Sequence, residues 1–505
     1  MQAQLVNVIF GMKVRRARMK ANLTLTEMAA RCEISPSYLT EVEKGRKYPR
    51  ADKIMRMADE LDTTYDELVS ITLPPALNYL ESTLSSSLLL QFPFDAFGLE
   101  ISDLVGLLTK APDKASALLH AMIEIGRQHD LREEHILWAA LRSYQELQDN
   151  YFPDIEDAAA DFARATGLAA QAPVSRQALE ELLVDEYGYT LDYTVLVDHP
   201  ELRGYRSVYR NGTRPRLLLN RALSESQLKF LLARELGYQR LELTERATTS
   251  SPDRVESFQQ VLNDFRASYF AGALLMPQAR FLADLGEFFS EPTWQPARLE
   301  AMLTRYDLTP EMLLYRITEL APRFFGLKLH FLRVQGVHGS YKLVKRLNMN
   351  RLLMPSGLAL DEHYCRRWLV MGLLRDLEAQ QAQAPAGDGN VLHVAAQYSR
   401  FLVPRHDFLC FGFARPLALN PTVNSSAIVG FQVDDTAREV IRFLDDAAVP
   451  HETINETCER CPLAPEECTV RAAPPTVWEA REARSRRRTA IAALDEVPVR
   501  AKTPA

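Results

Sequence analysis

The chain has 505 residues and a formal net charge of −7; 47% of its residues are hydrophobic and 25% are charged. This composition is typical of folded globular proteins and, at about 150 residues per domain, predicts roughly three domains. The acidic balance argues against indiscriminate nucleic-acid binding, and the sequence has no run of about 18 apolar residues to span a membrane. Because basic residues follow the apolar start instead of preceding it, no signal peptide is expected, and we predict a cytoplasmic protein.

The head of the chain is basic: residues 1–50 carry ten Lys/Arg and four Asp/Glu, a local charge of +6. Within it, residues 24–45 predict two short helices joined by a tight turn. Thr24 and Glu27 have the spacing of a capping box at the start of the first helix. Ser35 caps the second helix, which has a proline in its first turn and a glycine after its end.

The second helix buries an apolar face through Leu39 and Val42, which leaves its polar side chains free. Short polar side chains near a helix N-terminus suit base edges in the major groove, and basic side chains suit phosphates. The stretch resembles the Cro/repressor (XRE) helix-turn-helix family over residues 9–72. The resemblance implies a double-stranded DNA operator as partner; a plain helical hairpin is the alternative. The expected DNA-contacting residues are Thr24, Ser35, Ser37, Tyr38, Thr40, Glu41, Lys44, Arg46 and Lys47.

Residues 73–170 predict a helical linker or dimerisation region. Up to residue 97 a Pro-Pro pair and a serine-rich run are typical of a linker with little regular structure. Helices are predicted over 104–109, over 115–128 and from Arg132 onward. The last helix carries an apolar stripe at helical spacing, which indicates either core packing or the seam of a homodimer. The stripe consists of Leu137, Leu141, Tyr144, Leu147 and Tyr151.

Residues 171–290 change character: strands near 189–197 and 216–220 precede helices near 224–238 and 255–275. This order, together with Phe-Ala-x-x-Leu-Leu-Met-Pro at the end of the second helix, resembles the ImmA/IrrE family, which has a zincin-like metallopeptidase fold. That family carries His-Glu-x-x-His on the first helix and an acidic third ligand on the second. The resemblance therefore predicts three zinc-ligand positions in this chain.

None of these positions keeps its usual residue. Arg234 and Tyr238 replace the histidines, Arg266 replaces the acid, and only Glu235 of the motif remains. Because a catalytic zinc needs three protein ligands, we predict a zincin shell without its metal and without enzymatic activity. Either Glu235 and Arg266 form an ion pair between neighbouring helices, or the vacated cleft, lined by all four residues, binds an anionic small molecule. A zinc metallopeptidase that cleaves a repressor is the alternative from a different class.

Residues 291–475 predict an α+β domain, and residues 476–505 predict a disordered Arg-rich tail. The tail is expected to be solvated, with supplementary phosphate contact as the alternative. Helices are predicted over 309–320, from residue 365 onward and over 436–444, and strands over 329–334, 341–344, 408–415 and 427–432.

Three of the six cysteines lie within eleven residues near the end of this domain. Cys458 and Cys461 form a C-x-x-C pair, and Cys468 follows in a proline-containing turn. Thiolate groups spaced in this way select zinc or an iron–sulfur cluster. We predict a four-iron iron–sulfur cluster, with zinc as the alternative.

The fourth ligand must come from elsewhere, and the candidates are Cys365, Cys410 and His451. We predict Cys410, because its apolar, strand-like surroundings can place it at a sheet edge beside the turn. Cys365 precedes Arg-Arg-Trp on a predicted helix, where a packing role is expected.

The stretch from Cys410 to Pro475 resembles the C-terminal domain of the short-chain fatty acyl regulators, a group that includes propionate and glyoxylate regulators of actinobacteria. The shared features are the isolated cysteine, the C-x-x-C with its third cysteine, and Arg471 before a Pro-Pro pair. The resemblance spans nearly the whole chain, as a helix-turn-helix head, a helical linker, a zincin-like core and an α+β cysteine domain. It implies a transcriptional regulator of carbon or short-chain acyl-CoA metabolism that senses an acyl-CoA and redox state. A DNA-binding regulator with only a structural zinc is the alternative.

Overall fold

The computed structural model describes residues 2–70, 133–250, 255–337, 339–348, 362–383, 392–403 and 405–494. The chain divides into two compact units, one of residues 1–144 with 254–261 and the other of residues 145–253 with 262–505. The helices predicted over 104–109 and 115–128 lie outside the described residues. Among the helices that are described, none is long and apolar enough to cross a membrane.

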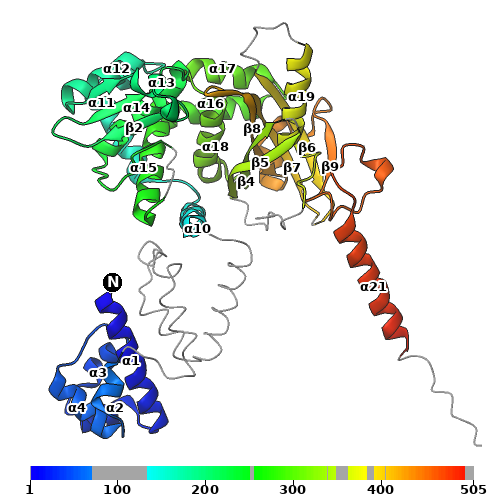
Figure 1. Ribbon diagram of the computed structural model, residues 1–505. Helices are drawn as coiled ribbons and strands as arrows, with labels where there is room; N and C mark the ends of the chain where they lie inside the picture. Colours follow the sequence, from blue (N-terminus) through cyan, green and yellow to red (C-terminus); the bar gives the residue numbers. More distant parts are fainter. Residues whose placement is uncertain are drawn as a thin grey trace, which may run out of the picture. The chain divides into compact units, whose positions relative to one another are not determined.

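Residues 2–70 form a helical bundle, as the helix-turn-helix prediction requires (Figure 1). Its helices are α1 (Gln2–Lys20), α2 (Leu25–Arg31), α3 (Pro36–Glu43), α4 (Ala51–Glu60) and α5 (Tyr65–Val69). Met28, Leu39 and Val42 are fully buried at its centre. α1 passes so close to α3 that a β-carbon added at Gly11 would lie 2.3 Å from the backbone oxygen of Val42, which is why glycine is needed there.

The rest of the described chain contains two sheets and twelve α-helices. The helices are α10 (Glu133–Leu147), α11 (Pro153–Ala165), α12 (Arg176–Glu181), α13 (Val195–Asp198), α14 (Glu225–Arg240), α15 (Phe258–Leu275), α16 (Gln278–Ser290), α17 (Pro296–Tyr306), α18 (Pro310–Phe325), α19 (Leu369–Gln383), α20 (Asp435–Val440) and α21 (Thr476–Leu494). The apolar stripe predicted after Arg132 is interrupted, because α10 ends at Leu147, which is 67% exposed, and Tyr151 lies beyond the helix.

The smaller sheet of the second unit has the strand order β1-β3-β2, with β1 parallel and β2 antiparallel to β3. Its strands are β1 (Thr190–Asp192), β2 (Ser207–Arg210) and β3 (Arg216–Leu219). The predicted strand near 216–220 is β3. The strand predicted over 189–197 stops at Asp192, because the Asp192 carboxylate accepts the backbone N–H groups of Thr194 and Val195 at 2.9 and 3.1 Å and caps the turn into α13.

The larger sheet has the order β5-β4-β8-β7-β6-β9, antiparallel throughout except for the parallel pair β6 and β9. Its strands are β4 (Leu329–Val337), β5 (Ser340–Asn348), β6 (His393–Phe401), β7 (Asp407–Leu417), β8 (Asn420–Gln432) and β9 (His451–Ile454). The four predicted strands of this region correspond to β4, β5, β7 and β8.

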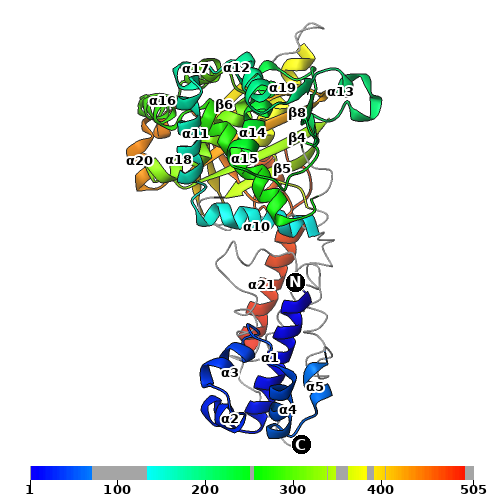
Figure 2. The same cartoon turned by 90° about the vertical axis from the view of Figure 1, so that its left-hand side faces the viewer.

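Helices cover both faces of this sheet (Figures 1 and 2). α19 packs on the face that carries Cys410. On the other face, the ring of Phe288 in α16 lies 5.4 Å from that of Phe411, and the ring of Tyr315 in α18 lies 5.7 Å from that of Phe331. Because side chains alternate along a strand, Cys410 and Phe411 point to opposite faces.

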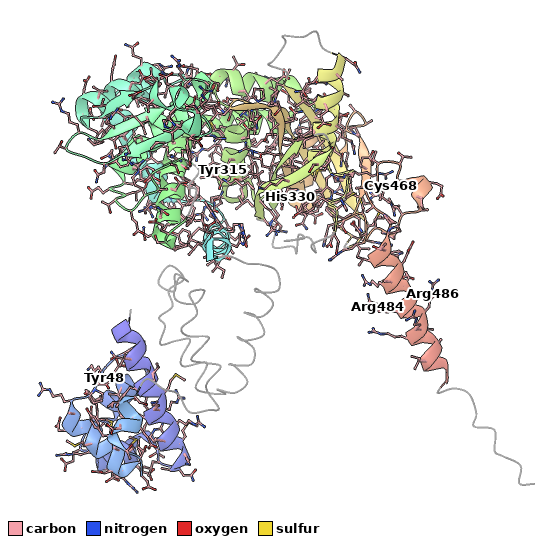
Figure 3. The ribbon with its side chains drawn as sticks, viewed as in Figure 1. Tyr48, Tyr315, His330, Cys468, Arg484 and Arg486 are labelled. Carbon is pink, nitrogen blue, oxygen red and sulfur yellow. The ribbon has the colours of Figure 1, made fainter. Side chains whose placement is uncertain are left out.

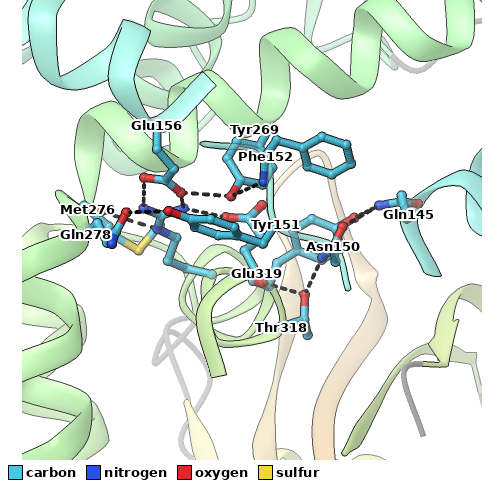
Figure 4. Close-up of polar contacts among 12 residues, drawn as sticks. Gln145, Asn150, Tyr151, Phe152, Glu156, Tyr269, Met276, Gln278, Thr318 and Glu319 are labelled. Carbon is cyan, nitrogen blue, oxygen red and sulfur yellow. Dashed lines mark hydrogen bonds and ion pairs between the residues drawn. The ribbon is translucent and has the colours of Figure 1, made fainter. Parts of the chain in front are cut away.

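A buried charge network ties α11 to α18 (Figure 4). Arg316, whose side chain is fully buried, donates to both carboxylate oxygens of Glu156 at 2.6 and 2.9 Å and to Glu319 at 2.9 Å. Tyr269 donates its hydroxyl to Glu156 at 2.8 Å. Because this network needs α11, residues 145–170, predicted as part of a linker, belong to the second compact unit.

The prediction of disorder from residue 476 is wrong for its first nineteen residues, which form α21. Arginine, alanine and glutamate dominate this segment, and all three are good helix formers. The backbone N–H of Trp478 also donates to the carbonyl of Glu459 at 2.9 Å, which fixes the start of the helix.

Candidate functional sites: a DNA-reading helix, a vacated zincin centre and a cysteine centre

The turn between α2 and α3 is held by the predicted caps. The Thr24 hydroxyl accepts the backbone N–H of Glu27 at 3.2 Å, and the Glu27 carboxylate accepts the N–H of Thr24 at 2.8 Å. The Ser35 hydroxyl accepts the N–H of Tyr38 at 3.1 Å. Between the helices, Glu33 has a left-handed φ of 50°, which makes the turn tight.

A nearly buried ion pair anchors α3 to α1. The Arg18 guanidinium meets both oxygens of Glu43, at 2.6 and 2.9 Å, and the hydrogen bond to Glu43 raises the pKa of Arg18. With Leu39 and Val42 buried on the same side, the rest of α3 can face a ligand.

The structure gathers the predicted DNA-contacting residues around the start and the end of α3. Thr40 donates its hydroxyl to the carbonyl of Pro36 at 2.9 Å, so its oxygen remains as an acceptor only. The exposed members of the set are Thr24, Ser35, Ser37, Lys44, Arg46 and Lys47, and the half-buried members are Tyr38, Thr40 and Glu41.

Cations surround the ring of Tyr38. The ammonium groups of Lys47 and Lys53 lie 5.6 and 4.6 Å from its centroid. Arg46 lies 3.5 Å from the Glu41 carboxylate, in an exposed pair that contributes little to stability. The charge at this end of α3 is therefore available to phosphates.

In the second unit, α14 and α15 hold the residues that stand at the zincin ligand positions. Tyr238 donates its hydroxyl to Asp264 at 3.0 Å, and Arg234 pairs with the same oxygen at 3.2 Å. A β-carbon added at Gly237 would lie 2.9 Å from the backbone oxygen of Ala267, so the two helices touch here.

The remaining motif residue, Glu235, is held by a cation that the motif does not predict. Arg246 donates to its two oxygens at 2.5 and 2.7 Å, and Tyr189 donates its hydroxyl at 2.7 Å. The Arg246 guanidinium also lies 3.8 Å from the ring centroids of Tyr238 and Tyr209. A fixed positive charge therefore stands among the residues at the motif positions, and both oxygens of Glu235 accept hydrogen bonds.

One prediction for this centre needs correction. Glu235 does not pair with Arg266, which instead meets Asp154 at 2.8 Å in a largely exposed ion pair. Arg234 and Arg266 thus pair with different carboxylates.

A more strongly cationic cluster lies where β2, β4 and β7 meet α18. Arg415 donates to Glu311 at 2.8 Å, and Arg333 lies 3.9 Å from the same carboxylate. Burial raises the pKa of Glu311, but the two arginines outweigh burial and hold it at about 2. Burial and the neighbouring Arg333 lower the pKa of Arg206, whose guanidinium has no carboxylate partner among the described residues.

Lys345 of β5 extends this cluster. Its ammonium group lies 3.7 Å from the ring centroid of Tyr315, and burial, followed by the charge of Arg333, lowers its pKa to about 8. Arg206, Arg333 and Arg415 thus lie around one carboxylate, Glu311, while Glu319 and Asp264 are the carboxylates that act on Lys345.

The cysteine centre forms where the chain before α19 pairs with the chain after β9. Tyr364 and Thr457 form an isolated antiparallel bridge, and the backbone N–H of Cys458 donates to the carbonyl of His363 at 2.9 Å. This pairing sets Cys365 beside the C-x-x-C turn. Burial, with the nearby thiols of Cys458 and Cys461, raises the pKa of Cys365 to about 11.

Donors surround these sulfurs. The backbone N–H of Ala472 donates to the Cys458 sulfur at 3.4 Å. The N–H groups of Asn455 and Arg367 favour the thiolate of Cys365. The side chain of Arg471 lies near Cys461, and its Nε and Nη1 atoms are buried without a partner. A donor left unpaired in this way suits an anionic group held by the thiols.

Cys410, the predicted fourth ligand, lies elsewhere. The Ser399 hydroxyl lies 3.8 Å from its sulfur, and burial raises its pKa to about 12 with no influence from the other cysteines. It points into the apolar core under α19. His451 stacks on the ring of Tyr398 at 4.4 Å in β6. Cys458 and Cys461 thus lie near enough to influence the pKa of Cys365, and Cys458 and Cys468 that of Cys461, whereas Cys410 does not take part. In this conformation no three of the described side chains of His, Cys, Asp or Glu are close enough to hold a metal ion.

Residues 14–68 match the family model described as helix-turn-helix, and residues 195–318 match that of the IrrE N-terminal-like domain. The chain carries an XRE-type helix-turn-helix DNA-binding domain followed by an IrrE-like domain. It is 24% identical over 338 residues, 64% of this chain and 68% of the relative, to the propionyl-CoA carboxylase regulator of Cereibacter sphaeroides. It is 26% identical over 68 residues, 13% of this chain and 84% of the relative, to control protein C.BamHI of Bacillus amyloliquefaciens. A solved Mycobacterium tuberculosis transcriptional regulator aligns with 66% of this chain and 92% of its own, at 19% identity and a TM-score of 0.47.

The sequence motifs of the IrrE-like domain did not reveal Arg246 or Arg206. Arg246 lies eleven residues after Glu235, in a stretch without a motif. Arg333 and Arg415 could have been singled out from the sequence, because each is a lone charge at the edge of an apolar strand-like run.

Proposed function

We propose that this chain is a sequence-specific transcriptional regulator of carbon or short-chain acyl-CoA metabolism, which acts in the cytoplasm as a homodimer. The observation that carries the proposal is α3, a capped helix pinned by Arg18 and Glu43, which exposes Ser35 and Ser37 at its N-terminus. Helix-turn-helix proteins read base edges from this position, and their dimers bind half-sites one helical turn apart. The two named relatives, a carboxylase regulator and a control protein, support a regulatory role.

Selection of bound fragments from random duplex DNA tests this proposal. We expect an enriched site with two inverted half-sites whose centres are about 10 base pairs apart. In Ser37→Ala, protection of the bases in that site should disappear. In Lys47→Gln, binding should weaken on every DNA sequence. No enrichment over random sequence would contradict sequence-specific binding.

The proposal excludes a peptidase role for the IrrE-like domain. Neither motif position carries a histidine, and Glu235 accepts hydrogen bonds from Arg246 and Tyr189. Both observations support this exclusion. Zinc needs three ligands, and a fixed guanidinium beside Tyr238 opposes a second cation. Added zinc should therefore neither bind to this domain nor support proteolysis.

An acyl-CoA is the proposed effector, as the resemblance to short-chain fatty acyl regulators implies. The positive charge of Arg206, Arg333, Arg415 and Lys345 supports a phosphate-bearing ligand, because arginine binds phosphate through paired N–H donors. We propose this cluster in preference to the predicted set of Arg234, Glu235, Tyr238 and Arg266, because Arg234 and Arg266 each have a carboxylate of their own, whereas Arg206, Arg333 and Arg415 lie around Glu311 alone. A ligand that prefers one DNA-binding state would shift the population of that state.

Calorimetric titration with coenzyme A and acetyl-, propionyl- and butyryl-CoA tests the effector. Arg206→Gln should weaken binding at least tenfold, because it removes a buried cation that has no carboxylate ion pair among the described residues and is free to bind phosphate. Arg266→Gln, in the exposed pair with Asp154, is the matched control and should bind as the parent does. Equal weakening by both variants would locate the ligand elsewhere.

We further propose that Cys365, Cys458, Cys461 and Cys468 hold an iron–sulfur cluster. The donor set fits: four cysteine sulfurs, backbone N–H donors beside them, and the unpaired N–H groups of Arg471. Among the described residues, no group of three or more His, Cys, Asp or Glu side chains is arranged to hold a metal ion in this conformation, so metal analysis decides between the cluster and zinc. When bound, the cluster would supply one-electron redox sensitivity.

Anaerobic purification with iron, sulfide and zinc analysis tests this centre. We expect about four iron and four sulfide per chain, as for a four-iron cluster. Cys365→Ser should lose the metal, whereas Cys410→Ser, equally buried but apart from the other thiols, should retain it. Stoichiometric zinc in a colourless protein would contradict the cluster. Loss of the metal in Cys410→Ser but not in Cys365→Ser would show that Cys410 is the fourth ligand.

A further inference from the structure

We propose that α21 is a second DNA-contacting element, which binds backbone phosphates of the duplex through one arginine face. The proposal rests on the DNA-binding function above, but it concerns a different part of the chain. The helix spans Thr476–Leu494 and begins on the cysteine segment, where the Trp478 N–H donates to the carbonyl of Glu459.

The charge on α21 is strongly one-sided. At 100° per residue, Arg481, Arg484 and Arg488 fall within about 60° of each other, and Arg487 lies beside them. The acidic residues of the helix, Glu479 and Glu482, fall on the opposite side together with Arg486. One face therefore carries four positive charges and no negative charge. Figure 3 shows the side chains of Arg484 and Arg486 extending from the helix.

Nothing in the described chain neutralises this face. Each described side chain from Arg484 to Ile491 is exposed, and none of the five arginines forms an ion pair with a described residue. Arg484 uses only its Nε, which donates to the carbonyl of Ala480 at 3.2 Å. Pairs such as Arg484 and Arg488, four residues apart, repel each other and destabilise the helix. A polar helix with this repulsion is stabilised by a polyanion.

The dimensions fit a duplex. From Arg481 to Arg488 the helix rises about 10 Å, and the same length of double-stranded DNA carries about six phosphate charges. A membrane surface fits less well, because interfacial helices need large apolar side chains on their other face. Between Arg481 and Ala490 the helix has none. The basic head of the chain already commits it to DNA, so the duplex is the polyanion that α21 meets.

Titration of the full chain onto its operator and onto an unrelated duplex, at several salt concentrations, tests the proposal. In Arg484→Gln/Arg488→Gln, the affinity for both duplexes should fall by the same factor. The slope of log affinity against log salt should flatten by about 2, at about 0.9 for each lost phosphate contact. The ratio of operator to unrelated binding should not change, because phosphates carry no sequence information.

Arg486→Gln, on the opposite face, is the matched control and should leave the slope as in the parent. Arg484→Lys/Arg488→Lys should restore most of it, because lysine also binds phosphate. Circular dichroism shows whether the glutamine variant keeps its helix. If the helix is lost, the lysine variant, which keeps the positive charges, still tests the role of charge. An unchanged salt slope in the glutamine variant would overturn the proposal, as would equal flattening by Arg486→Gln.

Two further outcomes separate this proposal from its foundation. If the parent protein does not distinguish operator from unrelated DNA, the proposed function fails, and the role of α21 in it fails too. In the second outcome, the parent protein binds its operator specifically, while the double glutamine variant loses binding to phosphatidylserine vesicles and keeps its binding to DNA. In that case a membrane, and not the duplex, is the partner of α21, and the proposed function stands.

Discussion

Replacing Arg246 with methionine tests whether Glu235 has become a structural residue. The side chains of Glu235 and Arg246 are 2% and 10% exposed, and the guanidinium supplies two of the three hydrogen bonds to the carboxylate. Arg246→Met leaves that carboxylate buried with only the Tyr189 hydroxyl. Removing one partner of a buried ion pair costs about 3–5 kcal/mol, and we expect the free energy of unfolding to fall by this amount.

Urea unfolding followed by tryptophan fluorescence measures the change, because Trp294, Trp368 and Trp478 all belong to the second unit. Glu235→Gln/Arg246→Met removes both charges at once and should be more stable than Arg246→Met alone. The double-mutant cycle isolates their coupling, which we expect to be at least about 1 kcal/mol.

A catalytic Glu235 predicts a different pattern. Glu235→Gln would then abolish a metal-dependent peptidase activity, while Arg246→Met would leave stability nearly unchanged. That combination would refute the interpretation of this centre as a zincin shell held by an ion pair.

Further expectations concern DNA, packing and pH. Ser37→Ala should cost about 1–3 kcal/mol on the operator only, whereas Lys47→Gln should weaken all sequences in a binding titration and flatten the salt slope. Arg316→Met should lower the free energy of unfolding in urea by about 3–5 kcal/mol, because it leaves the buried carboxylates of Glu156 and Glu319 without their cation. Burial raises the pKa of Glu319 from 4.5 to about 7, so the folded chain holds a proton there that the unfolded chain releases. Stability should therefore fall as pH rises from about 4.5 to 7, and Glu319→Gln should flatten this pH dependence; an equally steep profile in that variant would contradict the assignment.

Local signals predicted the helical bundle of residues 2–70 well. The capping box of Thr24 and Glu27, the cap at Ser35 and the buried face of Leu39 and Val42 each involve residues within four positions of each other. Hydrogen bonds of this kind are encoded in a few adjacent residues, so spacing alone can predict them. The polar face of α3 follows directly from which residues are buried.

The surroundings of Glu235 were predictable only in part. The loss of ligands at positions 234, 238 and 266 is visible in the sequence, but the replacement partners are not. Asp264 and Arg246 fill the centre from α15 and from a loop, and their choice depends on tertiary packing. Similarly, β1 ends at Asp192, because its carboxylate caps the following turn. The alternating apolar residues after it predicted a longer strand.

The choice between Cys365 and Cys410 shows where sequence reasoning reached its limit. Both cysteines are separated from the C-x-x-C pair by long stretches, so separation in sequence cannot rank them. The apolar run around Cys410 predicted a strand, and β7 confirms it, but a central strand covered by α19 buries its side chain in the core. Cys365 instead lies one residue from the bridge between Tyr364 and Thr457, and that bridge brings it to the turn. This backbone pairing is the reason for proposing Cys365 in place of Cys410. The same turn carries Glu459, whose carbonyl holds the start of α21, so loss of the centre would loosen the attachment of the arginine face.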